Sequence, residues 1–198
     1  MSAPTKQTGL PLFPLNTVVF PGGRLPLRIF EQRYIEMVKQ AIADSSPFGI
    51  CAIREGQETG TPAVPYTVGT LVRITDWDMP ETGILHIDTQ AEKRFVIRHT
   101  QLEPSGLLVG TVDDVSAEPA IAVPHELELA VEILRHIIDE YGAEHFPAPH
   151  DFDNAAWVGY RLSEVLPLKL SIKQDLLEMN DSVTRLRILA GFIKKQIN

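Results

Sequence analysis

The amino-acid sequence predicts an α+β protein in which a β-rich part, residues 1–118, precedes an α-helical part, residues 119–198. Short apolar runs separated by Gly, Pro and other turn-forming residues fill most of the first part, a spacing typical of a β-barrel or β-sandwich. Near residue 119 the pattern changes to the three- and four-residue spacing of α-helices. A length of 198 residues suits one large domain or two small ones.

The chain opens with the proline-rich stretch LPLFPLNTVVFPGG, residues 10–23. We predict two short strands here, residues 10–14 and 17–21, each ending at a proline, and a turn at Gly22-Gly23. Because proline has no N–H to contribute to a ladder, these strands should lie at a sheet edge, end early or contain bulges.

One helix is expected to interrupt the strands. Apolar residues recur at helical spacing over residues 30–42, and the Glu31 carboxylate suits the positive end of a helix dipole. Pro47 and Gly49 are expected to end this helix, and the apolar run 48–53 predicts a buried strand. A loop rich in Gly, Pro and Thr covers residues 54–66. Turn signals at 79–83 and 103–106 separate the remaining predicted strands, which are residues 68–77, 84–89, 94–101 and 107–115.

The second part predicts a small helical bundle. A helical pattern runs from about residue 119 to Tyr141, with Leu127, Leu134 and Tyr141 on one face. Ser171 and Gln174 have the spacing of a capping box. The other predicted helices are residues 155–165, 171–179 and 182–196, and residues 146–154 are predicted to form a loop.

Charge and cysteine content narrow the functional class. The formal net charge is −8, which disfavours nucleic acid and anionic membranes as partners, because both select basic surfaces. The single cysteine, Cys51, excludes an internal disulfide and a Cys-type zinc site. The N-terminus has no secretory apolar region, and the apolar run 10–20 is too short to cross a bilayer. We therefore expect a cytoplasmic protein.

Motifs for catalysis or cofactor binding are missing from the sequence. It contains no P-loop, no Gly-x-Gly-x-x-Gly, no Gly-x-Ser-x-Gly and no His-Glu-x-x-His. A cluster of His145, His150, Asp151 and Asp153 could hold a divalent metal, although solvated loop charges are the favoured interpretation. Cys51 is expected to be buried and inert rather than nucleophilic. We predict no catalytic residues, no metal and no cofactor.

Several blocks together resemble the N-terminal domain of the ATP-dependent protease Lon. They are LPLFPL (10–15), VVFPG (18–22) and LPLRIFEQRY (25–34), followed by FGI (48–50), VGTLVRI (68–74), KRFVI (93–97) and the closing helices over 162–194. Ala91 stands where that family often has glycine. The resemblance covers nearly the whole chain and implies a PUA-like pseudo-β-barrel followed by a helical bundle. The proline-rich opening is then interpreted mainly as a folding device, with a role in contacts as the alternative.

The resemblance implies a non-catalytic module that binds polypeptides, either as substrates or as an adaptor. The expected partners are proteins or unfolded polypeptides in protein quality control, among them a protease or chaperone, and homodimerisation stays open. RNA binding through the PUA-like barrel is the alternative, and a small-molecule site or hydrolase is a weaker one. Trp77 and Met79 are favoured as core or half-buried residues, with an exposed binding patch as the alternative. The candidate binding residues are Phe20, Arg24, Glu31, Arg33, Tyr34, Trp77 and Met79, together with the loop 54–66.

Overall fold

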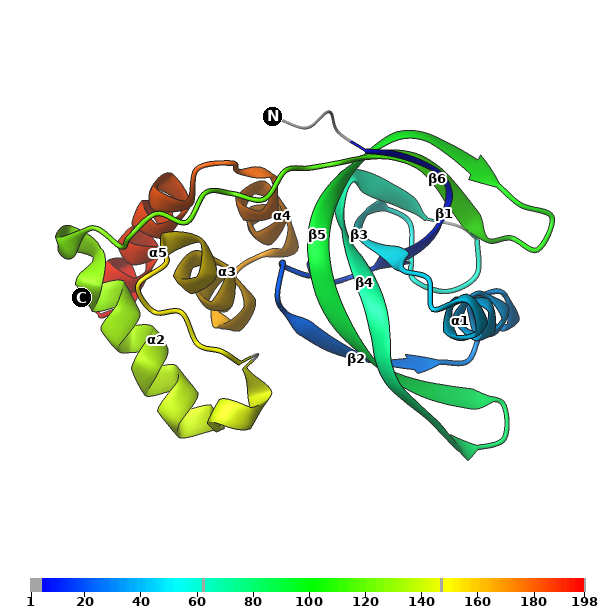
Figure 1. Ribbon diagram of the computed structural model, residues 1–198, viewed down its shortest axis with the longest axis horizontal. Helices are drawn as coiled ribbons and strands as arrows, with labels where there is room; N and C mark the ends of the chain where they lie inside the picture. The colour runs from blue at the N-terminus through cyan, green and yellow to red at the C-terminus, as the bar shows by residue number, and fades with distance from the viewer. Residues whose placement is uncertain (1–4, 62, 147, 198) are drawn as a thin grey trace. The chain divides into compact units, whose positions relative to one another are not determined.

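A computed structural model describes residues 5–61, 63–146 and 148–197. The chain divides into two compact units, Met1–Ser116 and Ala117–Asn198. In the first unit, six strands and one helix follow in the order β1 (Lys6–Leu15), β2 (Arg24–Ile29), α1 (Gln32–Asp44), β3 (Phe48–Glu55), β4 (Val64–Glu81), β5 (Ile84–Leu102) and β6 (Leu108–Asp114) (Figure 1).

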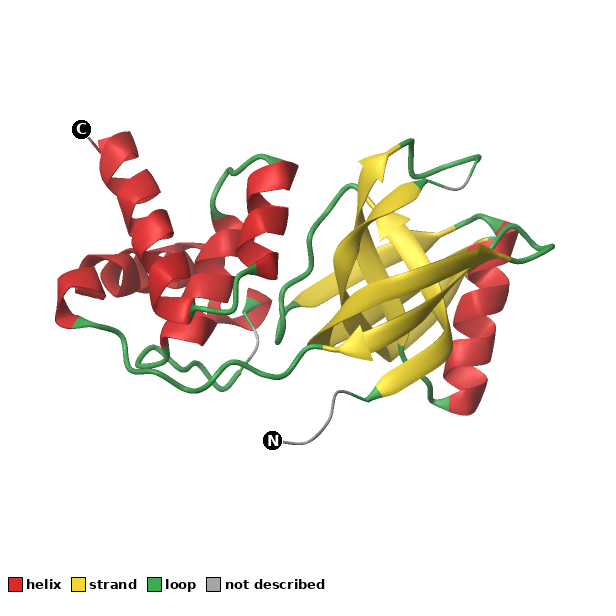
Figure 2. Ribbon diagram, turned by 90° about the horizontal axis from the view of Figure 1, so that it is seen from above, coloured by secondary structure: helices red, strands yellow, loops and turns green. Residues whose placement is uncertain are grey.

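The six strands form a closed, ring-like sheet (Figure 2). Their order is β2-β5-β4-β3-β1-β6, and the ring closes because β5 also pairs with β6. The long strand β5 makes this possible: its first part pairs with β2 and its last part, from Phe95, pairs with β6. Among the strand pairs of the described residues, only β1–β3 is parallel. The mixed sheet and the helical second unit confirm the predicted α+β pseudo-barrel fold.

Strand β1 includes two of the opening prolines, Pro11 and Pro14. It contains a bulge between Gln7 and Leu10, where Gly9 has a φ of 72°; this bulge lies before the predicted strand 10–14 and away from its prolines. The strand pairs on both sides, with β3 and with β6, which makes the edge position wrong. Pro14 lies at a parallel pair and Pro11 at an antiparallel pair.

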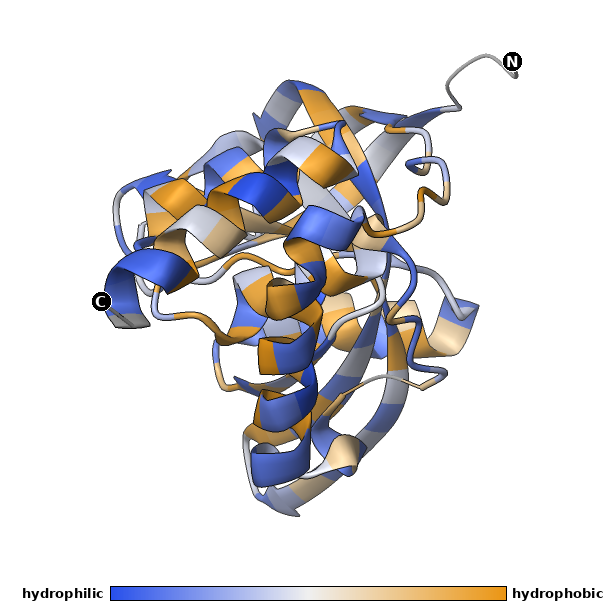
Figure 3. Ribbon diagram, turned by 90° about the vertical axis from the view of Figure 1, so that its left-hand side faces the viewer, coloured by the Kyte–Doolittle hydropathy of each residue, from blue (hydrophilic) through white to orange (hydrophobic). Residues whose placement is uncertain are grey.

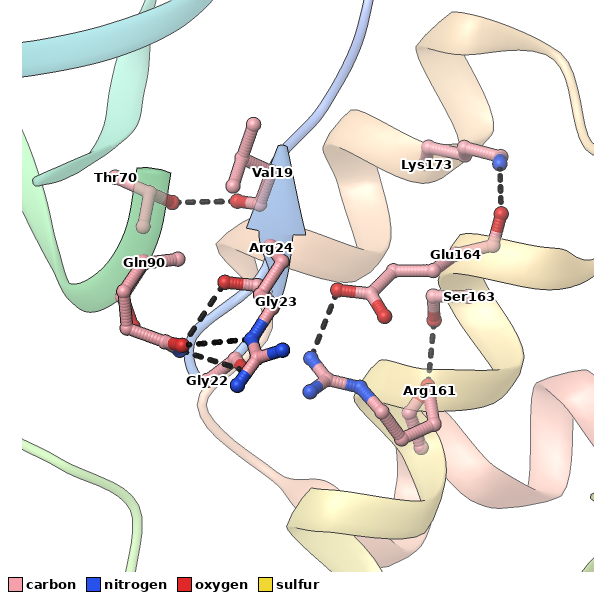
Figure 4. Close-up of polar contacts among 12 residues, drawn as sticks. Val19, Gly22, Gly23, Arg24, Thr70, Gln90, Arg161, Ser163, Glu164 and Lys173 are labelled. Carbon is pink, nitrogen blue, oxygen red and sulfur yellow. Dashed lines mark hydrogen bonds and ion pairs between the residues drawn. The ribbon is translucent and has the colours of Figure 1, made fainter. Parts of the chain in front are cut away.

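The predicted strand at residues 17–21 is wrong. These residues form a loop in which Val18, Val19 and Phe20 are buried. Its backbone is held by side chains far away in sequence, since Thr70 Oγ1 donates to the Val19 carbonyl at 2.6 Å (Figure 4). The Gln90 amide likewise donates to the carbonyls of the predicted Gly22-Gly23 turn, at 2.9 and 3.2 Å.

Three further features differ from the prediction. Helix α1 begins at Gln32, with Glu31 as an extended N-cap, and it ends at Asp44 because Ser45 adopts the left-handed conformation (φ 49°). The predicted strands 84–89 and 94–101 are one continuous strand, β5. The turn between β4 and β5 is confined to residues 82–83, so Met79 to Glu81 belong to the strand.

The centre of the barrel is filled by the ring of Phe95, which is fully buried. A Cβ added at Gly49 or at Gly69 would lie 2.6 Å from Phe95 Cζ. Glycine is therefore required at both positions so that the ring can pack against the backbone of β3 and β4. A second cluster, formed with Tyr34, Val38 and other apolar residues of α1, packs the helix against the sheet.

The second unit contains α2 (Glu128–Tyr141), α3 (Ala155–Val165), α4 (Leu170–Glu178) and α5 (Ser182–Ile197), with short 3₁₀ turns η1 (His125–Leu127) and η2 (Ala143–His145). Each of these helices carries both polar and apolar residues (Figure 3). Helix α3 packs against α5. Three predicted helices agree with the structure to within a residue or so, whereas α2 begins at Glu128 rather than near residue 119. Tyr141, however, is 71% exposed, and α4 starts at Leu170 with Lys169 as N-cap, so the Ser171 capping box is wrong.

Buried charges hold the second unit together. The Arg185 side chain has no exposure and pairs with Glu118, whose side chain is 4% exposed. Arg185 also donates to the carbonyls of Leu176 and Met179, and its guanidinium lies 4.3 Å from the centre of the Tyr160 ring. The Tyr160 hydroxyl donates to Glu118 at 2.6 Å. The segment that leads into the bundle is thereby fixed to α3 and α5.

Candidate polypeptide-binding surface

The β4–β5 hairpin carries the most exposed large apolar side chains among the predicted binding residues. Trp77 is 53% and Met79 43% exposed, so the favoured core or half-buried position is wrong for both. All seven residues of β4 from Thr75 to Glu81 are exposed, although a half-buried strand normally alternates. Figure 1 shows this end of the hairpin reaching beyond the rest of the sheet. Both of its faces are therefore open to a partner.

Trp77 lines two clefts. The first, of about 320 Å³, lies across β2, β4 and β5 and is lined by Pro26, Leu27, Arg28, Asp76, Asp78, His86, Ile87 and Asp88 in addition to Trp77. The second, of about 270 Å³, lies beside the end of α1, with Ile42, Ser45 and Ile74 among its walls. Trp77 thus borders both hollows, which suits a residue that anchors a bound chain.

A third, smaller and mostly apolar cleft of about 130 Å³ lies at the start of α1. Phe30, which is 58% exposed, lines it together with Phe13 and Tyr34. Glu58 and Thr59, from the predicted functional loop 54–66, form another wall. Sequence reasoning placed Phe30 on the buried face of α1 and missed this exposure, because the helix begins two residues later. The sequence signal that could have shown this is Glu31. A carboxylate is favoured at the N-terminus of a helix, so Phe30, which precedes it, lies outside the helix.

Glu31, Arg33 and Tyr34 form a structural clamp. Arg33 Nη2 lies 2.9 Å from Glu31 Oε2, and Nη1 donates to the Gly106 carbonyl at 3.2 Å, in the turn between β5 and β6. The Tyr34 ring stacks on Phe13 at 4.0 Å. Arg33 and Tyr34 are buried, and burial raises the pKa of the Tyr34 hydroxyl. Their contacts tie β1, α1 and the β5–β6 turn together.

The two remaining predicted residues lie in different environments. Phe20 has no exposed surface, so its side chain is not accessible to a bound chain. Arg24 is exposed at the start of β2, where its Nε lies 3.5 Å from Gln90 Oε1 (Figure 4). Among the seven predicted residues, the structure brings only Trp77 and Met79 together as accessible neighbours on one strand.

The side chains considered for a metal site or a nucleophile lie in separate environments in the described ranges. His150 packs between Phe152 and Trp157, with ring centres 5.7 and 5.6 Å away, whereas His145 lies 3.8 Å from Glu144. Within residues 5–61, 63–146 and 148–197, no group of three or more His, Cys, Asp or Glu side chains is placed to hold a metal ion. Cys51 is buried, and burial raises the pKa of its thiol far above the usual range. No helix in the described ranges has the length and hydropathy needed to cross a membrane.

Comparisons with known proteins agree with this architecture. The family model for the ATP-dependent protease La (LON) substrate-binding domain matches residues 9–195. The Lon protease of Anaeromyxobacter dehalogenans is 25% identical over 197 residues, which are 94% of this chain and 23% of that protein. Nearly the whole chain is matched, yet it spans only about a quarter of the length of these curated relatives.

Two solved structures share the fold. The crystal structure of a Lon N-terminal domain protein from Xanthomonas campestris is 33% identical, with a TM-score of 0.78 over 94% of this chain and 98% of that one. The N-terminal domain of the Mycobacterium avium complex Lon protease is 18% identical, with a TM-score of 0.63 over 91% and 95% of the two chains. The chain belongs to the family of the LON substrate-binding domain.

Proposed function

We propose that this chain is a non-catalytic module that binds exposed segments of other polypeptides, either to select them as substrates or to deliver them as an adaptor to a protease or chaperone. The observation that carries the proposal is the exposure of Trp77 and Met79 on a strand whose two faces are both open. Aromatic and Met side chains are enriched where proteins bind one another, and membership in the LON substrate-binding family supports a polypeptide as ligand.

The clefts around the hairpin support the same proposal. Together with the cleft at Phe30, they offer three separate hollows on one unit of the chain. Each has room for one or a few side chains rather than for a folded partner. An unfolded segment can fill such separate hollows because its side chains are not committed to a core of their own.

A binding assay with a matched control tests the proposal. The double variant Trp77→Ala/Met79→Ala removes both apolar side chains, and Leu102→Ala removes an equally exposed one, 52% accessible, at the other end of β5. Fluorescence anisotropy with labelled, unfolded β-casein should show about tenfold weaker binding for the double variant, because losing a central anchor costs at least ~1.4 kcal/mol. The control should bind within about twofold of the unchanged chain, a difference of only ~0.4 kcal/mol.

Two outcomes would contradict the proposal. The first is that unfolded β-casein does not bind at all at micromolar chain concentrations. The second is that the double variant and the Leu102 control weaken binding equally. A parallel titration with single-stranded RNA tests the alternative function. The four carboxylates of residues 76–88 should prevent RNA binding by repelling its phosphates.

A further inference from the structure

Beyond the end of β3, one edge of β4 has no strand beside it in the part of the chain that the structure describes. The pairing of β3 with β4 ends at Phe48 and Val72. Between Val72 and the hairpin turn, β4 pairs with β5 alone among the described strands, while β5 has β2 on its other side. The edge strand of the hairpin is therefore β4, which carries the exposed Trp77 and Met79.

The main-chain N–H groups of Trp77 and Met79 point towards this open edge. Each donates to the carboxylate of the residue before it, at 2.8 Å to Asp76 Oδ1 and at 2.7 Å to Asp78 Oδ1. N–H groups two residues apart lie on the same side of a strand. Their bonds to local carboxylates indicate that this side is not the one that bonds to β5.

The ladder on the other side of β5 gives the same direction. The Ala91 N–H donates to the Gly23 carbonyl at 2.8 Å, so alternate residues of β5, including Ile87, bond towards β2. Trp77 stands opposite Ile87. Residues directly opposite each other in an antiparallel pair exchange two hydrogen bonds or none, so Trp77 and Ile87 exchange none. The carbonyls of Trp77 and Met79 consequently face the open edge together with their N–H groups.

A cleft lies beside this edge. It is the hollow of about 270 Å³ between the end of α1 and β4, with Ile42, Ser45, Ile74 and Trp77 among its walls. Residues 45–47 join α1 to β3, so the hollow lies past the end at which β3 stops pairing with β4. Outward main-chain donors and acceptors beside a hollow are complementary to the backbone of an extended chain.

We propose that the open edge of β4 takes up an extended segment of the bound polypeptide as an added strand, antiparallel to β4 at Trp77 and Met79. This inference rests on the proposed function and specifies how the ligand is held. The segment replaces the carboxylates of Asp76 and Asp78 as hydrogen-bond partner, and both carboxylates turn to water. Main-chain bonds of this kind tolerate many sequences, whereas alternate side chains of the segment contact the indole and the thioether.

The charges of the hairpin favour such a segment over a second copy of this chain. Two copies of β4 paired around Trp77 would set Asp76 and Asp78 opposite the same carboxylates of the other copy, and like charges directly opposite each other destabilise a sheet. The outer edge of β2 is blocked in a different way. Pro26 stands opposite Asp88, which bonds towards β4, so the proline nitrogen faces outward and has no hydrogen to donate.

Methylated peptides test whether main-chain bonds hold the segment. A labelled peptide of about ten residues alternates Val with Ser, so that its apolar face meets the indole. Residues on the Trp77 face of an added antiparallel strand are also those that bond to β4. N-methylation of two Val residues should therefore weaken binding in fluorescence anisotropy about tenfold. N-methylation of two Ser residues should leave binding within about twofold.

Two variants remove the same bond from the protein side. Met79→Pro deletes the outward N–H and the side chain, whereas Met79→Ala deletes the side chain alone. Because this N–H does not bond to β5, both variants should unfold at similar urea concentrations. Met79→Pro should bind the unmethylated peptide about fivefold more weakly than Met79→Ala, since it lacks one hydrogen bond.

The outcomes separate this inference from the proposed function. Equal effects of the two methylation patterns, or equal binding by two folded Met79 variants, overturn strand addition and leave polypeptide binding in place. Binding of unfolded β-casein without binding of the unmethylated peptide has the same meaning. If neither ligand binds, the proposed function and this inference are overturned together. Should Met79→Pro fail to fold, the methylated peptides decide, because they need only the unchanged chain.

Discussion

Replacing Arg185 by Met should destabilise the helical unit more than almost any other single substitution. The substitution keeps most of the side-chain volume but removes the guanidinium, which contacts Glu118, Tyr160 and two main-chain carbonyls. Glu118, whose side chain is 4% exposed, would then lose its ion pair with Arg185. Breaking a buried pair by removing one partner costs about 3–5 kcal/mol.

The structure places the expected loss in the lower half of that range. The Tyr160 hydroxyl still donates to Glu118 at 2.6 Å, so part of the charge stays solvated by the protein. We therefore expect a loss of about 3–4 kcal/mol. A unit of 82 residues should have a urea dependence near 1 kcal/mol per molar. The unfolding midpoint should consequently fall by about 3 M urea.

The assay must report the helical unit alone. Trp77 lies in the first unit and Trp157 in the second, so a Trp77→Phe background leaves one indole, next to Phe152, to report unfolding of the second. The double variant Glu118→Gln/Arg185→Met should recover about 1–3 kcal/mol relative to the sum of the two single losses. A midpoint shift below 0.5 M, or strictly additive losses, would refute the buried ion pair as the main restraint.

Two other predictions concern the barrel and pH. Gly69→Ala should cost at least about 1–3 kcal/mol, because the new Cβ would lie 2.6 Å from both Phe95 Cζ and the Ile50 carbonyl, whereas Gly191→Ala, with open space around it, should not destabilise the chain in urea titrations. Burial raises the pKa of Glu164 to about 7 from 4.5, so the folded state holds this proton more tightly than the unfolded one, and its stability falls as pH rises through that window. Between pH 8 and pH 5 the free energy of unfolding of the unchanged chain should rise by at most about 2–3 kcal/mol relative to that of Glu164→Gln. The rise should stay below this limit because a quarter of the Glu164 side chain is exposed. A constant difference across that range would contradict the raised pKa.

The helical unit could be predicted closely because its signals are local. Periodicity identified the helices, and Asp181, which was expected to precede the last helix, accepts a hydrogen bond from the Thr184 N–H at 2.9 Å. The errors fall where the cap is not a polar side chain. Helix α4 starts after Lys169 without a side-chain cap, so the Ser171 pattern indicated the wrong start.

The barrel was harder to predict because its closure depends on distant partners. Strand β5 pairs with β2, β4 and β6, and no local pattern specifies three partners. The loop 17–21 resembles a strand in sequence, but Thr70 and Gln90, more than forty residues away, hold the loop and the turn after it. The exposure of Trp77 was missed for a related reason: alternation predicts one buried face, and the end of this hairpin has none.

The distribution of the family motifs separates scaffold from surface. Arg33 and Tyr34, within the opening block, form the clamp that holds α1 to the barrel, and Gly69, in the block 68–74, leaves space for the Phe95 ring of the block 93–97. Residues 75–88 lie between those last two blocks and carry the exposed side chains of Trp77 and Met79. The residues that make this chain a member of the family are thus largely those that build its barrel. Its choice of polypeptide is expected to reside in the hairpin, where substitutions change the surface and leave the core in place.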